Sequence, residues 1–198
     1  MKHATFMKLG LYCALVAGTG FSETLCSQTV YQSETMEIRL NGTSNIHNWE
    51  MKAITGTSQA SFTIDAKNNI TGLSHLSFTL PAKSLKSDHT GMDNNTYKAL
   101  RADNNPNLSF FLSSATVLPA SANTYQLSCL GKLTIAGTSK EINLVAFAKY
   151  NPSDKSYTIT GIKKMKMTDY NVSPPKALMG TIRTGDDISI SYTMKFTR

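Results

Sequence analysis

Cysteine is scarce in this chain, and so are long apolar runs. Of the three cysteines among 198 residues, Cys13 and Cys26 lie near the amino terminus and only Cys129 lies further along. A single cysteine in the body of the chain excludes an internal disulfide framework. No base is identifiable beside Cys129 in its alternating apolar stretch, so we interpret it as a small buried residue and not as a nucleophile. No apolar run after residue 27 is long enough to cross a membrane.

The sequence also lacks the signatures of the common catalytic and metal sites. It has no phosphate-binding glycine motif, no nucleophile elbow and no kinase signature. The histidines beyond residue 27, His47, His75 and His89, stand apart from one another and from any carboxylate or cysteine at ligand spacing. We therefore expect a protein that is not an enzyme and that holds no metal or cofactor. The alternative is a hydrolase or isomerase of a small amphiphile, with His47 or His89 as general base.

The first 27 residues have the pattern of a secretory signal peptide. Lys2 and Lys8 form a basic start, and residues 9–17 are an apolar run too short to span a membrane. We predict cleavage between Ser27 and Gln28, which leaves one domain over residues 28–198 in the periplasm or outside the cell. The alternative is a lipoprotein anchored through Cys26.

Acidic residues are fewer than basic ones. The formal charge is +7, and it becomes +6 when residues 1–27, with Lys2, Lys8 and Glu23, are removed. The basic residues are spread along the chain, and the densest set, residues 163–166, is too short for a nucleic-acid-binding arm. We therefore expect no nucleic-acid partner, but a transient contact with anionic lipid headgroups is compatible with the charge. The sequence leaves homodimer formation open.

Alternation of apolar and polar residues dominates from Glu34 onward and predicts half-buried strands. Met36, Ile38 and Leu40 share one face, for example. Turn residues separate the strands, including a hairpin expected at residues 184–186. About eight to ten strands without a βαβ rhythm predict an all-β sandwich or barrel. One short helix is expected over residues 93–101, where Asp93 would cap its start.

Two stretches carry a resemblance to a known family. Residues 93–110 place a small polar helix and an Asn-Pro turn before a strand, and residues 131–144 place a tight glycine turn between two strands. With residues 44–49 and 167–180 in the same order, the chain resembles the bacterial YceI-like, polyisoprenoid-binding family of lipocalin-like barrels. The resemblance implies a single antiparallel barrel of about eight strands. It also implies that an isoprenoid, fatty-acyl or other long-chain amphiphile is held in an apolar lumen.

The candidate lumen residues are the apolar ones on the more apolar face of each strand. They are Trp49, Met51, Phe62, Phe78, Phe110, Leu127, Leu144, Met165, Met167, Ile190 and Tyr192. A register slip of one residue would exchange inside for outside on any strand. Asn45 and His47, beside the only tryptophan, are candidates for polar contacts at the mouth. Two alternatives stay open: a corner in which Trp49 merely plugs the barrel end, and a structural or stress-related module whose barrel is filled by its own side chains.

Overall fold

The computed structural model describes residues 27–198, and the side chains from residue 29 onward. The expected signal peptide therefore lies, except for Ser27, outside the described residues. The strands are β1 (Ser27–Ser44), β2 (Asn48–Ala53), β3 (Thr57–Ile64), β4 (Ile70–Pro81), β5 (Asn107–Ser121), β6 (Thr124–Ile135), β7 (Thr138–Asn151), β8 (Ser156–Lys166), β9 (Lys176–Ala177) and β10 (Ile182–Thr197). Helix α1 spans Thr90–Leu100, and the 3-10 turns η1, η2 and η3 span Ala82–Ser84, Met167–Tyr170 and Leu178–Gly180.

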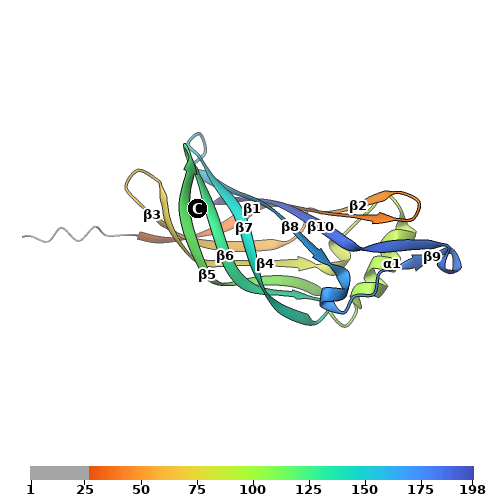
Figure 1. Cartoon of the computed structure of the whole chain (residues 1–198). Helices are drawn as coiled ribbons and strands as arrows, with labels where there is room; N and C mark the ends of the chain where they lie inside the picture. Colours follow the sequence, from red (N-terminus) through yellow and green to blue (C-terminus); the bar gives the residue numbers. More distant parts are fainter. Residues whose placement is uncertain (1–26) are drawn as a thin grey trace, which may run out of the picture.

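The sheet is antiparallel and closes on itself. Strands β1, β3, β4, β5, β6, β7, β8 and β10 follow one another around the barrel, and β10 pairs back onto β1 from Gln32↔Thr197 to Ser44↔Thr184. Closure pairs the first barrel strand with the last, although some neighbours, such as β7 and β8, pair over only part of their length. The lipocalin-like barrel of eight strands with one short helix is therefore confirmed (Figure 1).

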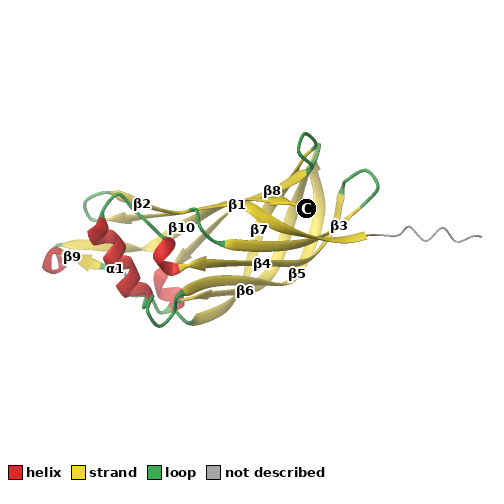
Figure 2. Ribbon diagram, turned by 180° about the vertical axis from the view of Figure 1, so that it is seen from behind, coloured by secondary structure: helices red, strands yellow, loops and turns green. Residues whose placement is uncertain are grey.

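Strand β1 is long enough to take two partners on the same edge. Its first part pairs with β3, from Ser27↔Ile64 to Gln32↔Gln59, and its last part pairs with β2, from Ile38↔Ala53 to Thr43↔Asn48. Residues 54–56 interrupt what is otherwise one strand. As a result β2 extends the barrel wall at one end, where α1, β9 and the 3-10 turns also gather (Figure 2). We call this the open end.

The opposite end of the barrel is filled by aromatic rings, and we call it the closed end. Phe62 contacts Tyr31 and Tyr157 at ring-centroid distances of 5.5 and 5.1 Å, and Phe196 lies 6.2 Å from Phe62. The Tyr157 hydroxyl donates to the backbone oxygen of Asn68 in the β3–β4 turn at 3.1 Å. The edge-to-face pairs Tyr31–Phe62 and Phe62–Phe196 add stability beyond the area they bury. Phe62, Tyr157 and Phe196 are at most 1% exposed, so these rings form a packed part of the core.

Two expectations about local structure are wrong. The hairpin expected at residues 184–186 lies inside β10, because Thr184 pairs with Ser44 and Gly185 approaches Thr43 so closely that a Cβ would lie 2.6 Å from the Thr43 hydroxyl. Asp93 does not cap α1 either, since His89 occupies that position. The interpretation of Cys129 as a buried residue is confirmed: it is 3% exposed, and burial raises the pKa of its thiol to about 11.

Candidate functional site

A cavity of about 360 Å³ lies inside the open end of the barrel. Its wall is mainly apolar, with Leu40 from β1, Met51 from β2, Leu108 from β5, Met165 from β8 and Ile190 from β10. These side chains come from strands on several sides of the barrel, and period-2 alternation turns each of them inward. The cavity is therefore the part of the barrel lumen nearest the open end.

Helix α1 forms the roof of this cavity and is fastened at both ends. Near its start, the Asp93 carboxylate accepts hydrogen bonds from the backbone N–H and the hydroxyl of Ser87, both at 2.7 Å. The Tyr97 hydroxyl donates to the backbone oxygen of Leu85 at 2.8 Å. Just past its end, the Arg101 guanidinium donates to the backbone oxygen of Ala136 at 2.6 Å. Four hydrogen bonds to two separate segments, residues 85–87 and Ala136, hold the roof in place.

The carboxyl group of Asp93 is the electrostatic anchor of this roof. Its burial disfavours the charged form, but the two Ser87 donors and the Lys86 ammonium, 3.7 Å away, outweigh that effect. The net result is an Asp93 pKa below the usual value. The anchor is therefore ionised at neutral pH.

Turn η2 closes a gap in the side of the barrel. Strands β7 and β8 pair only from Asn151↔Ser156 to Ala146↔Gly161, and η2 contacts both strands near the open end, where this pairing has stopped. Asp186 holds η2 by accepting from the Thr168 backbone N–H at 2.9 Å and from its hydroxyl at 2.6 Å. Tyr170, at the end of η2, lines the cavity. Its buried hydroxyl has no hydrogen-bond partner among the described residues.

An open polar hollow of about 820 Å³ adjoins the cavity. The two share Trp49, Met165, Lys166 and Ile188, and the hollow is also lined by polar and charged groups that include Asn48, Lys164, Asp169 and Asp187. The Trp49 ring lies on Gly42, where a Cβ would come within 2.2 Å of it, and its Nε1 donates to the Thr43 backbone oxygen at 3.0 Å. Trp49 is thus fixed between an apolar space and a polar one.

The structure brings six of the residues predicted from sequence to the cavity wall. They are Trp49, Met51, Met165, Met167, Ile190 and His47. The His47 Nδ1 lies 2.8 Å from the backbone oxygen of Asn48, so it faces a carbonyl group and not a carboxylate. Asn45, the other polar candidate, does not line the cavity. Its side chain bonds to the backbone of Thr181 and Arg183 at 2.9 and 2.8 Å.

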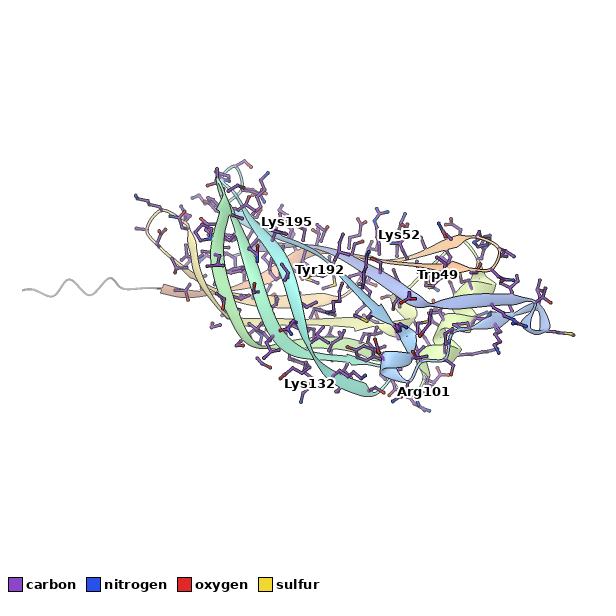
Figure 3. The ribbon with its side chains drawn as sticks, in the orientation of Figure 1. Trp49, Lys52, Arg101, Lys132, Tyr192 and Lys195 are labelled. Carbon is purple, nitrogen blue, oxygen red and sulfur yellow. The ribbon has the colours of Figure 1, made fainter. Side chains whose placement is uncertain are left out.

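The other six lumen candidates lie outside the cavity lining, in the packed interior or at its edge. They are Phe62, Phe78, Phe110, Leu127, Leu144 and Tyr192. Phe78 and Phe110 stack at 5.8 Å, and Tyr192 lies against Gly161, where burial raises its pKa to about 12. Figure 3 shows Trp49, on β2, near the open end, with Tyr192 further toward the closed end. Side chains fill the barrel between the cavity and the closed end, so a residue can face inward without lining the cavity.

The helix was expected from the sequence, but its place in the cavity wall was not, and neither was that of the irregular segment after η2 and the start of β10 that follows it. Met92, Thr96 and Ala99 on α1 line the cavity, as do Val172 and Ile182. The α1 residues are spaced by four and three positions, the signature of one helix face, which was available in the sequence. No comparable pattern marks the irregular segment.

No group of three or more His, Cys, Asp or Glu side chains among the described residues is placed to hold a metal ion. None of the helices that the structure describes is both long and apolar enough to span a bilayer.

Comparison with known proteins identifies relatives of the whole barrel. The family model described as "YceI-like domain" matches residues 31–196. BcnA of Burkholderia cenocepacia is similar in structure, with 17% identity and a TM-score of 0.64 over 82% of this chain and 96% of that one. So is a polyisoprenoid-binding domain of Saccharophagus degradans implicated in plant cell wall breakdown, with 7% identity and a TM-score of 0.61 over 84% and 97%.

A Campylobacter jejuni YceI protein is a third similar structure, with 18% identity and a TM-score of 0.52 over 71% of this chain and 81% of that one. Identities this low show a shared fold and do not by themselves transfer a ligand. No protein with a curated description matches the chain.

Proposed function

The chain belongs to the YceI-like domain family, and from that premise we propose that it is a binding protein for the apolar chain of an amphiphile, such as an isoprenoid or a fatty-acyl compound. The observation that carries this proposal is the apolar cavity roofed by α1. Transfer of a methylene from water to such a site is favourable by about 0.8 kcal/mol, so an apolar wall can bind a chain without many polar contacts. The description of the similar Saccharophagus degradans domain as polyisoprenoid-binding supports the same class of ligand.

The size of the cavity limits what it holds. If a methylene takes about the 30 Å³ that a water molecule occupies in the liquid, a cavity of about 360 Å³ holds roughly a dozen methylenes. We propose that this length of chain is buried, and that the polar end of the ligand lies in the neighbouring polar hollow, past Trp49. The hollow holds two cations, Lys164 and Lys166, and two carboxylates, Asp169 and Asp187, so its formal charge is balanced. It therefore suits a polar headgroup that both donates and accepts hydrogen bonds.

We further propose that the protein is a secreted or periplasmic carrier and not an enzyme. The basic start and short apolar run of residues 1–17 support export. General-base catalysis needs a titratable group held against the substrate. The two cavity-lining histidines, His47 and His89, have no carboxylate partner among the described residues to orient them.

A matched pair of substitutions on α1 tests the binding function. Ala99 lines the cavity, and Ala99→Phe places a ring in the space that the ligand would occupy. Asn94 is exposed on the same helix, and Asn94→Phe adds the same ring to the solvent side. Prenyl alcohols and fatty acids of increasing length are titrated into the wild type and both variants by calorimetry.

The expected result is binding that strengthens with chain length up to roughly a dozen carbons and then levels off. Ala99→Phe should weaken this binding at least tenfold, while Asn94→Phe should leave it unchanged. Absence of binding by the wild type, or equal affinities for the three proteins, contradicts the proposed function. Turnover of a bound ester or prenyl compound, lost in His47→Ala or His89→Ala, would favour the enzyme alternative.

A further inference from the structure

Two large apolar side chains stand in solvent at the tip of the open end. Leu178 and Met179, in the η3 turn between β9 and β10, are 71% and 110% exposed. Both have left-handed backbone conformations, with φ of 47° and 54°, and Gly180 follows with φ of 89°. This conformation is unfavourable for residues with a side chain. Figures 1 and 2 show this tip projecting beyond the barrel on the side of β9.

A further exposed apolar residue lies on a loop that is hydrogen-bonded to the segment next to this tip. Ile46, at the β1–β2 corner, is 57% exposed. The neighbouring Asn45 makes three hydrogen bonds to the start of β10: its backbone N–H donates to the Arg183 oxygen at 3.1 Å, its amide donates to the Thr181 oxygen at 2.9 Å, and its side-chain oxygen accepts from the Arg183 N–H at 2.8 Å. Ile46, Leu178 and Met179 thus lie on two connected loops, which we call the apolar rim.

Two cations flank the apolar rim without a counter-charge. Lys176 and Arg183 are direct cross-strand partners in the β9–β10 pair. Like charges placed opposite each other on a sheet repel. Within the described part of the chain neither residue forms an ion pair, and the Arg183 Nε donates only to the backbone oxygen of Gly180 at 3.2 Å. A surface that supplies negative charge would relieve this repulsion.

We propose that the apolar rim docks on an anionic lipid membrane, with Ile46, Leu178 and Met179 entering the headgroup region and Lys176 and Arg183 contacting lipid phosphates. Apolar side chains beside cations are the combination that such an interface binds. Lys176, Ala177 and Ile182 of the same hairpin also line the cavity, so docking places this part of the cavity wall close to the lipid. The inference of membrane docking depends only on the apolar rim and its two cations. A transfer of ligand between the cavity and the membrane would in addition require the proposed binding function.

The test is co-sedimentation of the mature protein, residues 28–198, with phosphatidylcholine vesicles containing or lacking phosphatidylglycerol. One variant combines Leu178→Ser with Met179→Ser, and another combines Lys176→Gln with Arg183→Gln. The matched controls are Leu118→Ser and Lys149→Gln, because Leu118 is 53% exposed and both residues lie toward the closed end.

The wild type and both controls should bind the anionic vesicles alike. The charge variant should lose roughly 30-fold in partitioning, since each cation near an anionic surface contributes roughly fivefold. The apolar variant should lose at least tenfold. No binding of the wild type to anionic vesicles, or equal binding of rim variants and controls, would overturn the proposal. Ala99→Phe separates the two ideas: it should bind vesicles normally even though it takes up no ligand.

Discussion

The substitution Phe110→Ala separates the packed interior of the barrel from the cavity above it. Phe110 is fully buried and stacks on Phe78 at 5.8 Å with an interplanar angle of 15°. On its other side it fills the space over Gly131, where a Cβ would lie 2.4 Å from its ring. Phe110 does not line the cavity, but Leu108, two residues earlier on β5, does. Removal of the Phe110 ring should therefore lower the stability of the protein and leave ligand binding intact.

The expected cost follows from these contacts. A Phe-to-Ala change in a close-packed interior lowers the free energy of unfolding by about 3 to 5 kcal/mol, and about 1 kcal/mol of this belongs to the stacked pair. The free energy of unfolding of such domains is about 5 to 15 kcal/mol, so the variant should still fold at low temperature. The control is Phe111→Ala, because Phe111 is the next residue on β5 and is 52% exposed on the outer face. That change should cost less than about 1 kcal/mol.

Urea unfolding and calorimetric titration with a prenyl alcohol provide the two readouts. Phe110→Ala should shift the unfolding midpoint strongly with little change in slope, and affinity for the ligand should match that of the wild type. A loss of affinity with nearly unchanged stability would show that Phe110 is part of the binding wall, and would refute this division of the barrel.

Two further predictions concern the roof and the wall of the cavity. Asp93→Asn should destabilise the protein by about 1 kcal/mol at neutral pH because it removes the charge that Ser87 stabilises. Since the Asp93 pKa is lowered by folding, this advantage exists above the usual carboxyl range and disappears as the pH falls through about 4 and below. Thermal midpoints of wild type and variant should therefore converge in acid, and a constant difference would argue against the anchor. Tyr170→Phe should raise the unfolding free energy by about 1 kcal/mol, because it removes a buried hydroxyl without a partner; a clear loss of stability in denaturant would contradict this.

The faces of the strands were predictable, and their partners were not. Alternation alone put Met36 and Ile38 on one face, and both are buried in the barrel. That pattern says nothing about which strand lies alongside, so the division of β1 between β2 and β3 had no signature in the sequence. Gly185 illustrates a second limit. A glycine next to two aspartates is typical of a turn, but here it permits the close approach of Thr43 within a continuous strand.

The candidate site could be predicted only in part for a related reason. Met51 and Phe62 both face inward, but Met51 lies beside the cavity and Phe62 lies in the aromatic closed end. Depth along a barrel depends on register and strand length, and neither is encoded in period-2 alternation. The roof formed by α1 depends on contacts such as Arg101 to Ala136, which join residues far apart in the sequence.

Photolabelling tests the central claim, that an apolar chain occupies the cavity at the open end of the barrel, most directly. A prenyl or fatty-acyl probe with a photoreactive group at the end of its chain is bound to the mature protein, activated by light, and located by peptide mass spectrometry. The account predicts labels on cavity-lining residues of α1 and β8, such as Met92, Ala99 and Met165, and their loss in Ala99→Phe. Labels concentrated on residues 60–73, 120–129 or 147–158, toward the closed end, or spread over the outer surface, would contradict it.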